Sequence, residues 1–202
     1  MSADRGADPL PPGGFFPVGL NLHNRLCVVV GPSNDREAIE KDAALREVGA
    51  NVRRVLDPAA LRDDDVAGAF FVISTPKDDA LSARLRALAD RHRFLLCCID
   101  QPAYGFVAMQ AIVKAGPARI GISTGGVAPR VGKVLKERLQ DALGERFARF
   151  MNVLAERRRA NRSRLPDVAA RRQAMLEAAE GFDVKIAVQY PDWFEKDSDG
   201  IR

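Results

Sequence analysis

The chain has 202 residues, of which 47% are hydrophobic and 29% are charged, and its net charge is +4 at neutral pH. Enough apolar side chains are present to build a core, which excludes a disordered chain. The longest apolar stretch, around residues 66–73, falls far short of the ~20 residues that span a bilayer, and no basic and apolar leader opens the sequence. We therefore expect a soluble, cytoplasmic protein with one domain, or with one domain and a helical annex.

Neither the cysteines nor the basic residues form a recognisable chemical motif. Cys27 and the adjacent Cys97 and Cys98 lie within apolar runs, where cysteine packs as a small hydrophobe, so we expect neither a disulfide framework nor a metal site. Seven arginines gather toward the C-terminus, at positions 157, 158, 159, 162, 164, 171 and 172. They lack interleaved aromatic side chains that would stack on bases, so we interpret them as a solvated helix face and expect no nucleic-acid partner.

Strands and helices alternate along most of the chain. Short apolar runs predict five strands, at residues 26–31, 51–56, 69–74, 94–99 and 118–122. Helical spacing predicts helices at residues 37–48, 78–92 and 129–143. Strands separated by helices of 10–15 residues indicate βαβ units, so we predict an α/β fold with a Rossmann-like parallel sheet and helices on both of its faces.

Composition divides the chain into four segments. These are a flexible leader at 1–14, a Rossmann-like dinucleotide-binding domain at 15–117, a linking strand and helix at 118–144, and a helical annex with a tail at 145–202. The annex is predicted to hold helices at 145–161 and 167–179. Residues 184–188 look like a strand, but the tail from Phe182 is expected to be irregular.

The turn after the first strand, Gly31-Pro32-Ser33-Asn34, is the first candidate site. In a doubly wound sheet this turn meets the pyrophosphate of a dinucleotide. Of the G-x-G-x-x-G pattern only Gly31 remains, Pro32 lacks an N–H, and Ser33 replaces the second glycine. Two interpretations stay open, namely phosphate binding and a structural turn in which Ser33, Asn34 or Asp35 caps the next helix.

Polar residues also follow the next three strands. Asp57 lies 26 positions after Gly31 and suits a ribose hydroxyl, but it equally suits a turn before a proline. Thr75 follows the third strand and Asp100 the fourth, at the edge where open α/β sheets bind ligands. A carboxylate in a cleft there can act as a general base, although an aspartate before Gln-Pro is also a common turn former.

The segment Ser123-Thr124-Gly125-Gly126 is the most distinctive motif. Two hydroxyls and two glycines between a strand and a helix predict a backbone-rich pocket for an anion. The alternative is a capped glycine turn.

Taken together, these motifs resemble those of the precorrin-2 dehydrogenase/sirohydrochlorin ferrochelatase family, which forms the N-terminal part of siroheme synthase and also occurs as a stand-alone protein. The matching segments, spread over residues 15–145, are 15–22, 47–50, 74–81, 99–102, 106–117 and 121–129. The Ser-Thr-Gly-Gly motif is the most specific of them.

The resemblance implies NAD-dependent oxidation of precorrin-2 to sirohydrochlorin in siroheme biosynthesis, with insertion of ferrous iron in some members. It implies that Asp100 is catalytic. NAD would be bound at Gly31, Pro32, Ser33, Asn34 and Thr75, with Asp57, which is additional to the family's pattern, holding the ribose. The tetrapyrrole would be bound at Ser123, Thr124, Gly125 and Gly126. It also implies that the C-terminal helices form a homodimer; no membrane partner is expected.

The chain departs from the family at the glycine turn, where the family's Val-Gly-Gly-Gly is Val30-Gly31-Pro32-Ser33, followed by about two extra residues. This departure motivates an alternative function, a tetrapyrrole chelatase or tetrapyrrole-binding protein that has lost the NAD site. A third hypothesis is a non-enzymatic Rossmann-like module that docks another protein through its arginine-rich helices.

Overall fold

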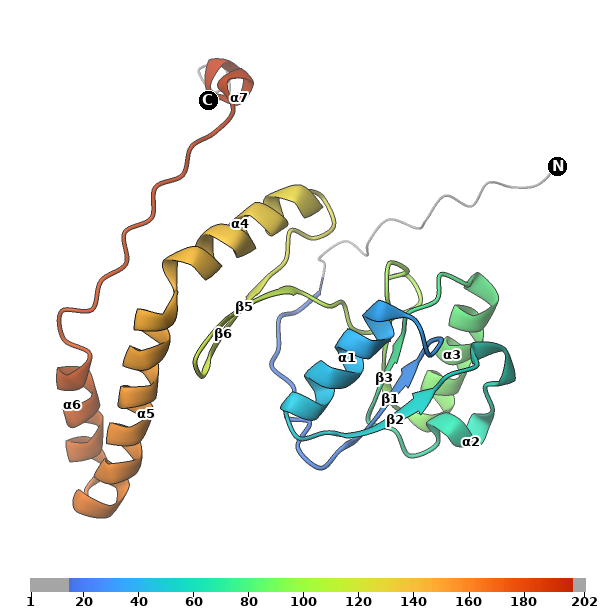
Figure 1. The fold of residues 1–202 in the computed structure, drawn as a ribbon, viewed down its shortest axis with the longest axis horizontal. Helices are drawn as coiled ribbons and strands as arrows, with labels where there is room; N and C mark the ends of the chain where they lie inside the picture. Colours follow the sequence, from blue (N-terminus) through green and yellow to red (C-terminus); the bar gives the residue numbers. More distant parts are fainter. Residues whose placement is uncertain (1–14, 198–202) are drawn as a thin grey trace. The chain divides into compact units, whose positions relative to one another are not determined.

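The computed structural model describes residues 15–197, so the predicted leader at 1–14 lies outside the described residues (Figure 1). The chain separates into two compact units. One comprises the residues up to Lys114 together with Arg119–Ala142, and the other comprises Ala115–Ala118 together with the residues from Leu143 onward. The functional boundaries expected at 117 and 144 stay predictions.

A four-stranded parallel sheet forms the centre of the first unit. Its strands are β1 (Leu26–Val30), β2 (Asn51–Val55), β3 (Phe71–Ser74) and β4 (Leu95–Cys98), in the order β2-β1-β3-β4. In the register, Val28 lies beside Arg53 on one neighbouring strand and Val72 on the other. The predicted parallel sheet is therefore confirmed.

Helices cover both faces of this sheet, because apolar residues occupy every position of its central strand. Val28 and Val30 share a buried cluster with Leu85 of α3 (Asp79–His92). Cys27 and Val29 point the other way and pack with Ala38 of α1 (Arg36–Glu47). Each fully buried aliphatic side chain of this kind contributes about 1.5–3 kcal/mol. Burial on both faces explains why β1 is a continuous apolar run in the sequence.

The crossover between β2 and β3 was not predicted to hold helices. It contains a short 3-10 turn, η1 (Pro58–Ala60), and a single-turn helix, α2 (Asp63–Val66). Within α2, Val66 is fully buried and supplies the packing that holds the segment on the sheet.

The strand predicted at residues 118–122 is confirmed, and it lies outside the four-stranded parallel sheet. These residues form β6 (Ala118–Ile122), which pairs with β5 (Ala111–Ala115), a strand that was missed, in a separate two-stranded sheet. Only Gly116 and Pro117 separate these strands, and Gly116 has φ +57°. A connection this short joins strands in a hairpin, whereas a parallel pair needs a crossover of a dozen or more residues.

Side-chain contacts tie Lys114 and Arg119 to the helices of the first unit, to which both residues belong. Glu47 at the end of α1 pairs with Lys114 at 2.5 Å and with Arg119 at 3.2 Å. Gln140 of α4 (Pro129–Ala142) bonds both backbone groups of Lys114, accepting from its N–H at 3.0 Å and donating to its carbonyl at 2.7 Å. The predicted helix at 129–143 is thus confirmed.

The second unit is helical, as predicted. Its helices are α5 (Glu145–Arg164), α6 (Val168–Ala178) and α7 (Asp192–Asp197), of which α7 was not predicted. Residues 184–188 form no strand. No residue of α5 or α6 is buried, and apolar side chains such as Val168 and Leu176 are well exposed. Within residues 15–197, no helix is both long and apolar enough to cross a membrane.

Candidate functional site

The carboxyl ends of the four parallel strands meet at one edge of the sheet, and four of the predicted site residues follow these ends. Gly31 follows β1, Asp57 follows β2, Thr75 follows β3 and Asp100 follows β4. Polar side chains at this edge are where open parallel sheets bind ligands. The structure therefore brings the predicted cofactor residues and the predicted catalytic residue to one edge.

Gly31 is required by the packing of the protein itself. Its N–H donates to the carbonyl of Val55 at 3.0 Å, which closes the turn against β2. A Cβ on Gly31 would overlap Oγ1 of Thr75 and lie 2.9 Å from the Cβ of Ala38. No side chain fits at position 31, which explains why this one glycine of the motif is present.

Asp35 caps the helix that follows the turn, which resolves the three capping alternatives. Its Oδ1 accepts from the N–H of Glu37 at 2.9 Å, and its Oδ2 accepts from the hydroxyl of Thr75. The Thr75 hydroxyl, the backbone N–H groups of Glu37 and Ala38, and the nearby Arg54 cation hold the pKa of Asp35 below its usual value. The carboxylate therefore stays ionised at neutral pH.

The rest of the turn offers donors to an external ligand. Arg54 donates from one guanidinium nitrogen to the carbonyls of Gly31 and Pro32, both at 3.2 Å, and its Nε is buried without a partner. Within residues 15–197, the backbone N–H groups of Ser33 and Asn34 have no protein acceptor. Unpartnered N–H groups on the exposed residues Ser33 and Asn34, with a cation bonded to the same turn, suit a phosphate group.

Asp57 is exposed, and its carboxylate accepts from the N–H of Ala59 at 3.0 Å, capping η1. In this structure its side chain performs the turn role that was the alternative to ribose binding. A ribose hydroxyl would have to compete with that cap.

Asp100 combines an exposed carboxylate with an uncommon backbone conformation. Its φ is +57°, in the left-handed region that aspartate tolerates better than most residues. Oδ2 lies 2.7 Å from Nζ of Lys77, and the side chains are 61% and 68% exposed. The carboxylate raises the pKa of Lys77 above its usual value. Asp100 thus faces solvent as half of an ion pair.

The segment after Asp100 is anchored by the side chain of Gln101. Its amide oxygen accepts from Ser82 Oγ at 2.8 Å, and its amide nitrogen donates to Asp79 at 2.6 Å. Both partners lie in the first turn of α3, so the turn that carries Asp100 is fixed to that helix.

The Ser123–Gly126 motif forms a turn of its own before α4. Gly125 and Gly126 have φ values of +60° and +78°, and the N–H of Gly125 donates to Ser123 Oγ at 3.3 Å. The methyl group of Thr124 packs 3.4 Å from where a Cβ would stand on Gly132. In the part of the chain that the structure describes, no hydrogen bond or ion pair joins this turn to Asp100.

The cysteines are placed for packing. All three are buried and free, and burial raises the pKa of the Cys97 thiol to about 12. Such a thiol stays protonated at neutral pH and binds metal poorly. Among residues 15–197, no three His, Cys, Asp or Glu side chains gather closely enough to hold a metal ion.

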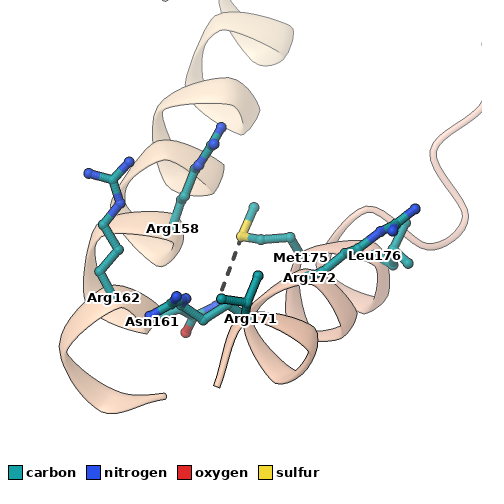
Figure 2. A pocket seen from close by; sticks show the side chains of 8 residues that line it. Arg158, Asn161, Arg162, Arg171, Arg172, Met175 and Leu176 are labelled. Carbon is teal, nitrogen blue, oxygen red and sulfur yellow. Dashed lines mark hydrogen bonds between the residues drawn. The ribbon is translucent and has the colours of Figure 1, made fainter. Parts of the chain in front are cut away.

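A pocket of about 430 Å³ lies between α5 and α6 in the second unit (Figure 2). Its lining residues are Arg158, Asn161, Arg162, Val168, Arg171, Arg172, Met175 and Leu176. Asn161 donates to the sulfur of Met175 across the pocket at 3.9 Å. Arg162 and Arg172 extend away from each other, so these two guanidinium groups do not converge on one anion position.

Lys77 was not among the predicted site residues, although it lies within the matching segment at 74–81. The available signal was its position just after β3. Because β3 pairs with β4 and Asp100 follows β4, the two residues lie at the same edge of the sheet.

Comparison with known proteins relates most of the first unit to a family described by dinucleotide binding. Residues 18–111 match the family described as putative NAD(P)-binding. In structure, the chain resembles SirC, a precorrin-2 dehydrogenase, with a TM-score of 0.68 and 18% identity, over 83% of this chain and 90% of that one. This likeness confirms the fold.

Sequence similarity extends into the helical unit. The chain is 29% identical over 179 residues to the siroheme synthase of Xylella fastidiosa (strain M12), which covers 79% of this chain and 37% of that protein. It is 27% identical over 186 residues to the siroheme synthase of Hahella chejuensis (strain KCTC 2396), covering 83% and 39%. The predicted resemblance is confirmed, and the chain spans little more than a third of the length of these relatives.

Proposed function

We propose that the chain oxidises precorrin-2 to sirohydrochlorin with NAD⁺, as a step of siroheme biosynthesis, and that Asp100 is its general base. The observation that carries the proposal is the exposed Asp100–Lys77 pair at the ligand-binding edge of a dinucleotide-type sheet. The similarity to siroheme synthases supports the choice of substrate.

The residues of the glycine turn fit a dinucleotide phosphate. Gly31 and Pro32 form the wall of the turn, and the N–H groups of Ser33 and Asn34 would donate to phosphate oxygens. Thr75 supports the turn from β3, and Asp57 would reach a ribose hydroxyl after leaving its cap. When bound, NAD⁺ supplies a hydride acceptor.

Asp100 would accept a proton from the macrocycle as the hydride leaves. Because its ion pair with Lys77 is solvent-exposed, a substrate carboxylate can take over Lys77 while Asp100 turns to the reacting carbon. The hydroxyls of Ser123 and Thr124 and the N–H groups of Gly125 and Gly126 would bind further carboxylates of the tetrapyrrole.

The experiment compares Asp100→Asn with Asp90→Asn, an exposed aspartate on α3 paired with Arg86. Asparagine tolerates the left-handed backbone, so the fold should persist. Turnover, followed as NADH formed from precorrin-2, should fall about 10²–10⁴-fold in Asp100→Asn and stay within about twofold in the control. Equal turnover in both variants would remove Asp100 from the mechanism.

We further propose that the chain forms a homodimer in the cytoplasm and that it also inserts ferrous iron into sirohydrochlorin. The exposed Val168 and Leu176 support association through the second unit. Light scattering at micromolar concentration should give twice the mass of one chain, and a monomer would remove that part. Iron insertion is tested by adding ferrous iron to sirohydrochlorin with and without the protein.

A further inference from the structure

We propose that Asp35 blocks the anion position at the N-terminus of α1, so that this chain binds a dinucleotide phosphate more weakly than its fold allows. The inference rests on the proposed function only in taking this edge as the cofactor site. It concerns a residue to which neither the motif nor the comparisons assign a ligand role.

The first step is the hydrogen bonding of the helix end. The first N–H groups of a helix lack partners within the helix and attract an anion. In this chain the Asp35 carboxylate is that anion, because its Oδ1 accepts from the N–H of Glu37 at 2.9 Å. A phosphate reaching these groups must displace the carboxylate.

The second step is the rigidity of the carboxylate. Its other oxygen accepts from the Thr75 hydroxyl, and Thr75 is only 8% exposed. A Cβ on Gly31 would lie 3.3 Å from Asp35 Oδ2, so the carboxylate also rests against the wall of the turn. Asp35 therefore cannot swing aside without losing bonds to two separate elements.

The third step is charge. The pyrophosphate of NAD⁺ carries two negative charges, and the pKa of Asp35 is held low enough that its carboxylate is ionised at neutral pH. Arg54 offsets part of this repulsion through its position behind the carbonyls of Gly31 and Pro32. The N–H groups of Ser33 and Asn34 remain available to the phosphate, but the Asp35 carboxylate occupies the N-terminus of α1.

The test measures binding of NAD⁺ and of inorganic pyrophosphate by calorimetry to the full chain and to Asp35→Asn. Asparagine retains a side-chain oxygen that can cap α1, but carries no charge. Asp42→Asn is the control, because Asp42 lies on the same helix and, among residues 15–197, its ion-pair partner is the exposed Arg46. We expect Asp35→Asn to bind both probes at least tenfold more tightly, and the control to stay within twofold of wild type.

The two probes separate this inference from the proposed function. Tighter pyrophosphate binding with no NAD⁺ binding in either protein would uphold the role of Asp35 and remove the dehydrogenase function. Unchanged or weaker binding of pyrophosphate in Asp35→Asn would overturn the inference, whatever NAD⁺ does. If Asp35→Asn does not melt cooperatively, Asp35→Ser, which supplies a neutral cap of a different shape, is measured in its place.

Discussion

Replacing Gly31 with alanine tests whether the glycine turn is set by internal packing. The added methyl group would overlap Thr75 Oγ1 and lie 2.9 Å from the Cβ of Ala38. Neither neighbour can move freely, because Thr75 bonds Asp35 and the carbonyl of Val30, and Ala38 is fully buried in α1. Forcing a methyl group into a packed site costs about 1–3 kcal/mol. We expect Gly31→Ala to lose that much free energy of unfolding.

The assay is urea and thermal unfolding followed by far-UV circular dichroism. The chain's single tryptophan, Trp193, lies in α7, so its fluorescence would not report on the sheet. Gly19→Ala is the matched control, since a Cβ there meets nothing within 4 Å. Thr75→Ala removes the nearest obstructing atom, so the double variant should lose less than the sum of the two single variants. Equal stability of Gly31→Ala and Gly19→Ala would refute the packing argument.

Three other substitutions give separate expectations. Asp78→Ala removes the cap that accepts from Leu81 at 3.0 Å and should lower the free energy of unfolding by about 1 kcal/mol, measured by urea denaturation. Asp100→Gly relieves the φ of +57° and should be at least as stable as wild type in a thermal melt, yet inactive. Burial raises the pKa of Cys97 from 9.0 to about 12, so the thiolate forms at lower pH in the unfolded chain than in the folded one. As the pH rises above 9, the free energy of unfolding of wild type should fall relative to that of Cys97→Ala, whereas below pH 9 the difference between the two should not change with pH.

Much of the sheet could be predicted because burial on both faces leaves a strong local signal. β1 and β3 are continuous apolar runs, and Asp78 together with the following apolar spacing marks the start of α3. The sequence of β6 identifies a strand but not its partner. Its pairing with β5 depends on the two-residue connection between the strands. Such a connection makes a hairpin and does not belong to the βαβ pattern from which the sheet was predicted.

The site was predictable only as a set of positions. Each predicted cofactor residue follows a strand, and parallel pairing carries those positions to one edge. The hydrogen bonds between these side chains depend on how segments distant in the sequence pack together, which no local sequence pattern indicates. Arg54 reaches back to the turn at Gly31, and Asp35 meets Thr75 across 40 residues of sequence. These contacts decide which groups remain available to a ligand.

The two carboxylates at this edge differ in what they are free to do. Asp35 accepts from the Thr75 hydroxyl with one carboxylate oxygen and from the backbone N–H of Glu37 with the other, so both oxygens of its ionised form are engaged. Asp100, among the described residues, pairs with the ammonium of Lys77 alone, and both side chains face solvent. A general base must exchange its partner for a substrate proton at little cost, which an exposed pair allows and a helix cap does not. Asp100 is therefore the better placed of the two carboxylates for the proton transfer that we propose, and Asp35 for the proposed effect on phosphate affinity.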